Sequence, residues 1–157
     1  MSIDPTEVPL PIPGKEVIFR HMDDPDMPWQ LCRAQQNADG STSYVREKWF
    51  AFSPDPQYLS LYAEYDPGMM VRRHGHYSPH IVFVIDGGLW FGERWCPAGT
   101  HVELPFGAAF GPIRAGEEGA KLYEVMMGDP RSWGDQPEVY EAALEEHGVT
   151  PLPDPPP

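Results

Sequence analysis

Three histidines stand at positions 74, 76 and 80, close enough in the chain to bind one metal ion. His74 and His76 are two residues apart, so in an extended segment both side chains leave the same face and their ring nitrogens can converge. His80 follows a Ser-Pro break and begins the apolar run 81–85, which is typical of a strand buried on both faces. Imidazole is a good ligand for zinc, iron, nickel and copper. The spacing therefore predicts a metal site whose ligands are His74, His76 and His80.

The elements that must position these histidines are short strands. Between Val45 and Met127, apolar stretches recur about every eight to twelve residues with glycine or proline between them, the pattern of an all-β sandwich or barrel. Asp86, Gly87 and Gly88 are expected to end the strand that His80 begins, as a turn. The predicted strands are 44–52, 58–65, 69–74, 80–85, 89–93, 100–104, 108–113 and 120–127.

The two ends of the chain differ from its middle. Proline is concentrated in the first 28 residues and in the closing segment 150–157, so both ends are expected to be extended or disordered. Residues 135–147 are predicted to form a helix, because Pro137 suits a first turn and Gly148 suits a helix end. We divide the chain into a Pro-rich N-terminal extension packing on the barrel (1–44), the barrel (45–128), and a C-terminal helix with a Pro-rich tail (129–157).

The histidine segment resembles the first motif of the cupin superfamily. Gly68, His74, His76, His80 and Gly87 match the spacing of that motif, with histidine at position 80 where most members carry glutamate. The resemblance implies an all-β fold, a cupin-like double-stranded β-helix (jelly-roll barrel) with a short C-terminal helix. It also implies one divalent metal ion inside the barrel, with Fe2+ as the first choice and Zn2+, Mn2+ or Ni2+ as alternatives.

The second cupin motif is only partly present. Its glycines and proline have counterparts in Gly99 and in the segment 105–107, but Phe110 occupies the position of its metal-binding histidine. His101 is the candidate replacement, and Glu103 follows it at period two on the same face of the predicted strand. A turn at 106–107 would place residue 103 opposite residue 110.

Two arrangements of the strand 100–104 are open. If His101 and Glu103 face inward, His101 is a metal ligand and Glu103 is a catalytic base or a further oxygen ligand. A shift of one residue buries Val102 and Leu104 instead and exposes the two polar side chains. The resemblance favours the inward arrangement, because cupins commonly carry an exposed acid at the residue just after this glycine, which is Thr100 here.

Aromatic residues are candidates for the wall of a substrate pocket above the ion, although each could equally belong to an ordinary core. Phe110 is favoured, because the ligand position of the family points at the metal, and Tyr62 and Trp90 are further substrate-binding candidates. Arg72 and Arg73 are consecutive and point to opposite faces, so at most one lies on the same face as the histidines. There it would bind a substrate carboxylate, and a surface ion pair is the other interpretation. The full aromatic set is Tyr62, Tyr65, Trp90, Phe91, Phe106 and Phe110.

The composition excludes several kinds of partner. The chain has 157 residues, enough for one domain, and its 24 acidic against 11 basic residues give a net charge of −13, which would repel nucleic acid. No segment approaches the roughly 20 apolar residues of a membrane span, and the first residues lack the features of a signal peptide, so we expect a cytoplasmic protein. The cupin resemblance implies a homodimer, formed through edge strands or swapped termini.

These features favour a metal-dependent single-domain cupin enzyme that acts on a small organic molecule, first of all a mononuclear oxygenase of the dioxygenase type. A metal-dependent lyase or isomerase would use the same residues, with the ion as Lewis acid and Glu103 as base. A non-catalytic cupin that binds a metal or a metabolite as a sensor is the alternative from another class, supported by the missing second-motif histidine. The number of histidines disfavours a storage-like structural role.

Overall fold

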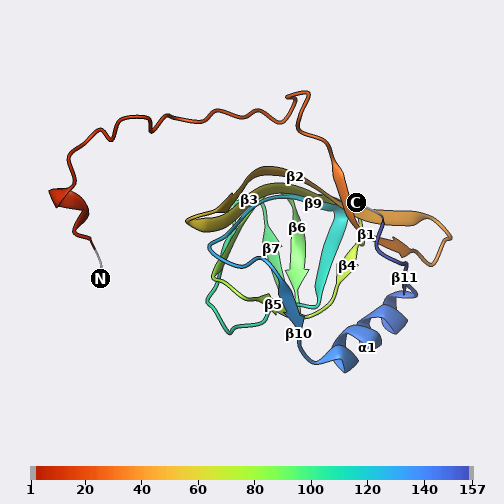
Figure 1. The fold of residues 1–157 in the computed structure, drawn as a ribbon. Helices are drawn as coiled ribbons and strands as arrows, with labels where there is room; N and C mark the ends of the chain where they lie inside the picture. The colour runs from red at the N-terminus through yellow and green to blue at the C-terminus, as the bar shows by residue number, and fades with distance from the viewer. Residues whose placement is uncertain (1–2, 156–157) are drawn as a thin grey trace.

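Two long antiparallel strands, β6 (His80–Phe91) and β9 (Ile113–Met126), form the centre of the computed structural model, which describes residues 3–155 (Figure 1). The remaining elements are η1 (Pro5–Glu7), β1 (Gln30–Gln36), β2 (Thr42–Pro54), β3 (Gln57–Tyr65), β4 (Met70–Val71), β5 (His74–His76), β7 (Arg94–Pro97), β8 (His101–Leu104), β10 (Ser132–Gly134), α1 (Pro137–His147) and β11 (Thr150–Pro151). The predictions of an all-β fold and of a helix near 135–147 are confirmed. None of the helices in residues 3–155 has the length and hydropathy needed to cross a bilayer.

The strands form one large curved sheet and one small one. The large sheet has the order β11-β1-β2-β3-β9-β6-β7, while β4 also pairs with β9 and β8 also pairs with β6. β8 occupies the first half of the free edge of β6, and β7 occupies the second half. The small sheet consists of β5 and β10, in which His76 lies opposite Ser132. The histidine strand β5 is therefore held by a partner that follows β9 in the sequence.

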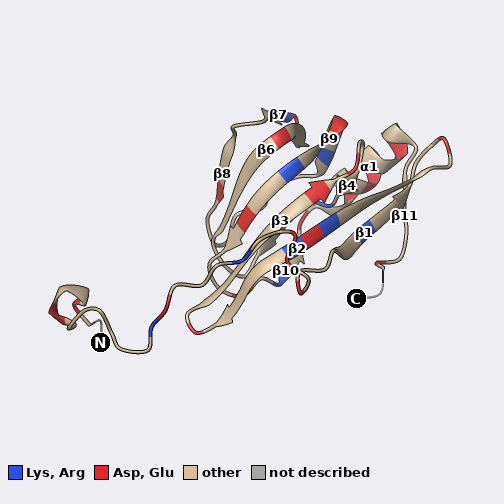
Figure 2. Ribbon diagram, turned by 90° about the horizontal axis from the view of Figure 1, so that it is seen from above, with Lys and Arg blue, Asp and Glu red and all other residues tan. Residues whose placement is uncertain are grey.

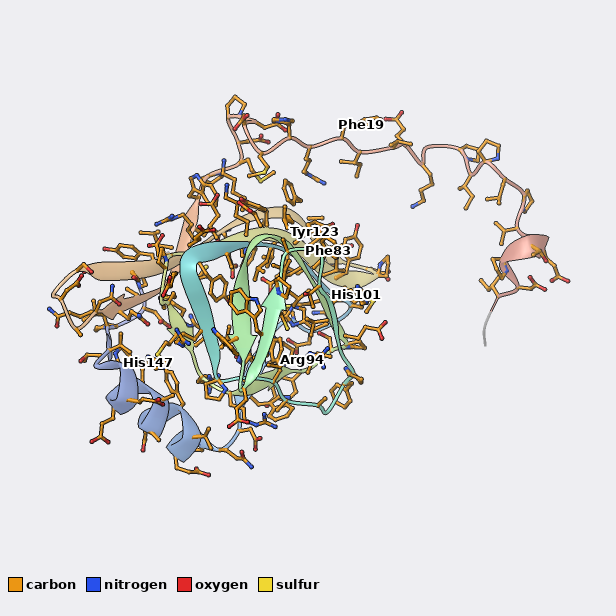
Figure 3. All side chains as sticks on the ribbon, turned by 180° about the vertical axis from the view of Figure 1, so that it is seen from behind. Phe19, Phe83, Arg94, His101, Tyr123 and His147 are labelled. Atoms are coloured by element: carbon orange, nitrogen blue, oxygen red, sulfur yellow. The ribbon has the colours of Figure 1, made fainter. Side chains whose placement is uncertain are left out.

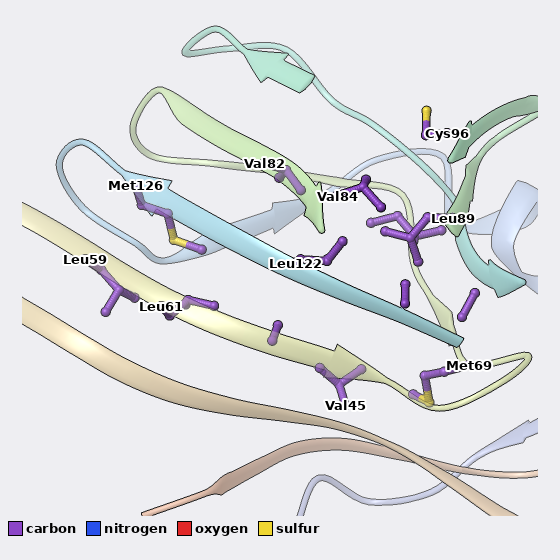
Figure 4. Packing of buried hydrophobic residues seen from close by; sticks show 14 residues of the cluster. Val45, Leu59, Leu61, Met69, Val82, Val84, Leu89, Cys96, Leu122 and Met126 are labelled. Carbon is purple, nitrogen blue, oxygen red and sulfur yellow. The ribbon is translucent and has the colours of Figure 1, made fainter. Parts of the chain in front are cut away.

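Alternation along the strands decides which side chains are buried. Side chains on a strand point to opposite faces in turn, so every second residue can enter the interior. Leu59 and Leu61 of β3, Val82 of β6 and Leu122 of β9 are all buried and belong to one cluster (Figure 4). Burial of each such side chain stabilises the fold by roughly 1.5–3 kcal/mol. These four side chains line the same pocket as His74, His76 and His80.

The predicted turn at Asp86, Gly87 and Gly88 is wrong, because β6 runs through it without interruption. Two irregularities in the pairing with β9, one between Val84 and Asp86 and one between Gly87 and Leu89, accommodate these residues. Gly87 has a φ of 67°, and a Cβ there would collide with the carbonyl of Gly119. The glycine therefore permits a close approach of two strands and does not end one.

The predicted strand 108–113 is also wrong: Phe110 forms an isolated bridge to His74, and Ile113 is already the first residue of β9. The bridge has two backbone hydrogen bonds, of 3.0 and 2.9 Å. Gly111 has a φ of 104°, and Pro112 has no backbone N–H to donate, so a regular ladder cannot continue here. β8 pairs with β6 instead, and residue 103 does not lie opposite residue 110.

The predicted N-terminal extension 1–44 is divided between three environments. Residues 30–44 contain β1 and the beginning of β2 and so belong to the sheet. Residues 22–29 pack on its outer face, where Lys48 Nζ donates to the carbonyl of Met22 at 2.6 Å and Trp29 contacts Tyr62. Residues 3–20 project away from the barrel (Figures 1 and 2), so the expectation that the whole extension packs on the barrel is wrong for this part. The C-terminal tail joins the sheet through β11.

Candidate metal centre

The structure brings the three predicted histidines together in the interior. His74 and His76 lie on β5, His80 is the first residue of β6, and all three are buried. The ring centroids of His74 and His76 are 5.1 Å apart, and those of His76 and His80 are 4.7 Å apart. Gly75 between the first two is required, because a Cβ there would collide with the carbonyl of Ala108 and the ring of Trp133. The close packing of β5 thus explains the His-Gly-His sequence.

Backbone carbonyls orient two of the rings. Nδ1 of His74 lies 2.7 Å from the carbonyl oxygen of Arg72, and Nδ1 of His76 lies 2.9 Å from that of Pro130. A carbonyl oxygen only accepts hydrogen bonds, so each Nδ1 carries the proton and each Nε2 keeps a free lone pair. This is the arrangement that second-shell partners give to metal-binding histidines.

Burial keeps the same two rings neutral near pH 7. It lowers the pKa of His74 to about 4, and the hydrogen bond to the Arg72 carbonyl offsets only part of this effect. The pKa of His76 is lowered as well, first by burial and then by the positive charge that His80 would carry. Metal binding requires the neutral imidazole, so both groups are available as ligands at physiological pH.

His80 is the histidine of the three whose ring nitrogens lack hydrogen-bond partners. Its exposed fraction is 2 %, yet neither of its ring nitrogens has a hydrogen-bond partner within residues 3–155. Leaving a buried polar group unpaired costs about 1–3 kcal/mol, so such groups are rare and call for an explanation. A cation bound at this position would satisfy one of the two nitrogens, and the donor set therefore fits a metal ion.

The ring nitrogens of the three histidines do not converge on one point. Among the residues that the structure describes, no group of three or more histidine, cysteine, aspartate or glutamate side chains has the geometry of a metal centre. The planes of His74 and His76 make an angle of 80°, and those of His76 and His80 an angle of 86°. The rings therefore pack edge to face, and rotation of the side chains is needed to bring three nitrogens to one point.

Glu124 is a polar site residue that the sequence did not lead us to predict. This residue of β9 is buried, and its Oε1 lies 3.3 Å from Nε2 of His80, although the contact lacks the alignment of a hydrogen bond. The signal was present in the segment 122–126, where buried Leu122 and Met126 flank residue 124 at period two. The alternation alone places Glu124 on the inner face.

His101 and Glu103 lie outside the barrel, so their predicted inward orientation is wrong. Their side chains are 52 % and 74 % exposed, and they contact one another across 3.5 Å on the outer surface, where Figure 3 labels His101. On β8 the buried side chain is that of Leu104, which lies opposite His80. The register that buries Leu104 turns both polar residues outward, as the second arrangement of this strand required.

A pocket of about 340 Å³ contains the three histidines. Phe110 lies in its wall, with its ring centroid 5.0 Å from that of His74 and 5.8 Å from that of His80. Tyr65 and Phe91 line the pocket too, as the sequence suggested. The polar residues that also line it are Cys32, Arg33, Glu47, Arg72, Glu124, Arg131 and Ser132.

Three of the predicted pocket aromatics lie elsewhere. Tyr62 points to the outer face of β3, where its hydroxyl donates to Glu64 at 2.8 Å. Trp90 is on the outer face of β6, against Trp95 and below the guanidinium of Arg114. Phe106 is exposed on a turn. Tyr62 and Trp90 are therefore not in contact with the pocket, because each alternates with an inward-facing neighbour.

Around Glu47 and Cys32, which also line the pocket, the environment disfavours negative charge. Burial, together with the charge of Glu124, raises the pKa of Glu47. Burial likewise raises the pKa of the Cys32 thiol to about 12, so in the metal-free protein this cysteine is a neutral thiol and not a nucleophile at neutral pH. The inner pocket thus combines neutral imidazoles and an apolar wall with two carboxyl groups.

No protein-family model matches the chain, and no curated protein sequence does. Solved structures do: a candidate acetylacetone dioxygenase from Methylibium petroleiphilum PM1 superposes with a TM-score of 0.59 at 13 % identity, covering 84 % of this chain and 96 % of the other. An acetylacetone dioxygenase from Acinetobacter johnsonii gives 0.56 at 15 % identity, with coverages of 83 % and 95 %. An RmlC-like cupin protein from Ralstonia eutropha JMP134 gives 0.52 at 16 % identity, with coverages of 87 % and 93 %. The predicted cupin fold is confirmed.

Proposed function

We propose that this protein is a metal-dependent cupin enzyme that oxidises a small organic molecule with dioxygen. One observation carries the proposal: three buried imidazoles meet in one pocket, two of them oriented by carbonyl groups and the third without any hydrogen-bond partner in residues 3–155. The fold that the chain shares with the acetylacetone dioxygenase of Acinetobacter johnsonii supports the oxygenase over other cupin activities.

His74, His76 and His80 would hold the ion, and Glu124 stands beside His80 as a fourth group of opposite charge. A divalent ion supplies Lewis acidity, and ferrous iron also supplies a site where dioxygen and substrate can be activated together. Iron is the metal we propose, and zinc, manganese and nickel are accepted by the same ligand types.

The chain's own residues have separate tasks in this proposal. Phe110 packs against His74 and Phe91 and keeps water from the ligand face of the histidines. Glu124 is placed to accept a proton from a substrate carbon or hydroxyl that enters beside His80. The apolar wall binds the body of the substrate, so that only its polar end meets the histidines.

The test is oxygen uptake after anaerobic reconstitution with ferrous iron, using small diketones, 2-oxo acids and phenols as substrates. We expect iron-dependent uptake with at least one of them, with its loss in His80→Ala and its retention in His101→Ala. The two variants remove the same ring, one from the pocket and one from the outer surface. Iron that binds without stimulating uptake above the His80→Ala level would contradict the oxygenase.

A metal-dependent lyase or isomerase is the second candidate, and Glu124 is the observation that favours it. A buried carboxylate next to a ligand is suited to removing a proton from a carbon beside a carbonyl group. This enzyme would consume substrate without oxygen when loaded with zinc or manganese. A sensing cupin, which Phe110 at the second-motif position would suit, predicts binding of a metal or a metabolite with no turnover under either condition.

A further inference from the structure

Exposed side chains mark the opening of the pocket, and most of them are positively charged although the chain has a net charge of −13. Three of the eleven basic residues, Arg33, Arg72 and Arg131, line this one pocket. They come from β1, from the connection between β4 and β5, and from the segment before β10. Charges of one sign around an opening attract ligands of the opposite sign.

Two of these three arginines are already neutralised. Arg33 forms an ion pair with Asp154 at 3.2 Å, and Arg131 donates hydrogen bonds to both carboxylate oxygens of Asp129. Arg72 has no carboxylate partner among the residues that the structure describes. It is therefore the cation at this opening whose charge is free for a ligand.

The neighbouring β10 strand holds the Arg72 side chain in place. Its Nη2 donates to Ser132 Oγ at 3.1 Å, and a Cβ on Gly134 would lie 2.6 Å from Nη1, so the guanidinium lies directly over the Gly134 backbone. The carbonyl of Arg72 also accepts the hydrogen bond from Nδ1 of His74 at 2.7 Å. One residue thus orients a candidate ligand through its backbone and presents a cation to the pocket through its side chain.

We propose that the substrate is a small carboxylate with an apolar body, whose carboxylate binds Arg72 at the opening while its other end reaches the histidines. This inference rests on the proposed function, because it assigns the substrate class of the same site. Arginine recognises carboxylates through paired, charge-assisted hydrogen bonds. The neutral ester of the same acid offers no negative charge to this group.

The inner pocket fixes the direction of binding. Glu124 is buried beside His80, and its carboxylate would repel a carboxylate that entered first. The apolar side chains that line the pocket, among them Leu61, Val82 and Phe110, suit the body of the molecule. The charged end therefore stays at the opening with Arg72.

Arg73 provides a matched control. It is the next residue, but its Nε donates to Asp135 at 2.8 Å and its Nη1 to the carbonyl of Gly111, and it does not line the pocket. Arg72→Gln and Arg73→Gln remove the same charge from the same segment. Only the first removes it from the opening.

The experiment is calorimetric titration of the protein, with zinc added in slight excess, by 4-methyl-2-oxopentanoate and by its methyl ester. Zinc does not support oxidation, so binding is measured without turnover. We expect the carboxylate to bind more tightly than the ester, and Arg72→Gln to weaken the carboxylate about tenfold while leaving the ester unchanged. Arg73→Gln should change neither, and added salt should weaken only the carboxylate.

The inference would be overturned by equal affinity for the two ligands, by absence of carboxylate binding at millimolar concentration, or by equal effects of the two arginine variants. The comparison holds whether or not zinc binds, since it isolates the contribution of Arg72. Failure of the oxygenase would appear separately, as carboxylate binding that depends on Arg72 in a protein without iron-dependent oxygen uptake.

Discussion

His80 and Glu124 lie diagonally across the pairing of β6 and β9, with Nε2 of the histidine 3.3 Å from Oε1 of the glutamate. Val82 is the residue directly opposite Glu124, and Met126 is directly opposite His80. Diagonal neighbours on one face of a sheet are within reach of long side chains. The contact therefore follows from the register of the two central strands, and its function can be tested at either residue.

Glu124→Gln should weaken metal binding. The substitution keeps the size of the side chain and removes the charge beside His80, which we expect to lower zinc affinity about tenfold to a hundredfold. Competition with a chelating dye measures this affinity. Glu103→Gln is the control, because this glutamate contacts a histidine on the outer surface. Equal affinities of the two variants would exclude Glu124 from the metal centre.

Phe110→His should strengthen metal binding and weaken the fold. The new ring would lie beside His74 and His80, where the phenyl ring now is, and would add a fourth imidazole. Loss of apolar burial should cost the metal-free protein roughly 1–2 kcal/mol of unfolding free energy. Phe91→His is the control, since Phe91 also lines the pocket and stacks on Phe110. Tighter zinc binding in that control would show that any added histidine suffices.

Stability of the metal-free protein should fall as the pH is lowered below neutrality. Burial depresses the folded-state pKa of His74 from 6.5 to about 4, so the unfolded chain binds more protons than the folded protein in this range. The contribution of neutral His74 to the free energy of unfolding is fully present above pH 6.5. It is lost as the pH falls towards 4, by about 1.4 kcal/mol per pH unit.

The free energy of unfolding in urea, measured with a chelator at about pH 7 and at about pH 5, tests this prediction. His74→Gln removes the titrating ring and should reduce the difference between the two conditions. Carboxylates titrate in both proteins and cancel in the comparison. An unchanged difference in the variant would mean that His74 is protonated in the folded protein.

The cupin resemblance implies a homodimer, and the N-terminal arm, residues 3–20, makes this prediction testable. Val17, Ile18 and Phe19 are 77 %, 70 % and 88 % exposed, and Figure 3 shows Phe19 far from the barrel. An extended segment of this kind can cover apolar surface on a second copy, where Phe83 and Tyr123 lie exposed on the outer sheet.

Light scattering should give twice the chain mass of 17.7 kDa, and Phe19→Asp should shift the population towards the monomer. Thr6→Asp adds the same charge elsewhere on the arm and should leave the dimer intact. A wild-type protein that stays monomeric at micromolar concentration would contradict the assembly.

The sequence determined much of this protein because strand periodicity is local. The spacing of His74, His76 and His80 predicted that three rings would meet, and the alternation of apolar residues predicted an all-β fold. Both inferences need only the rule that successive side chains point to opposite faces. The same rule applied to 122–126 would have found Glu124.

Only the tertiary structure decided which strands pair and in which register. β8 pairs with β6 and not with the segment that contains Phe110, and this choice turns His101 and Glu103 into solvent. It also decided that Arg72 faces the pocket while Arg73 binds Asp135. A shift of one residue exchanges the two faces of a strand at no local cost, so packing of the whole sheet selects between them.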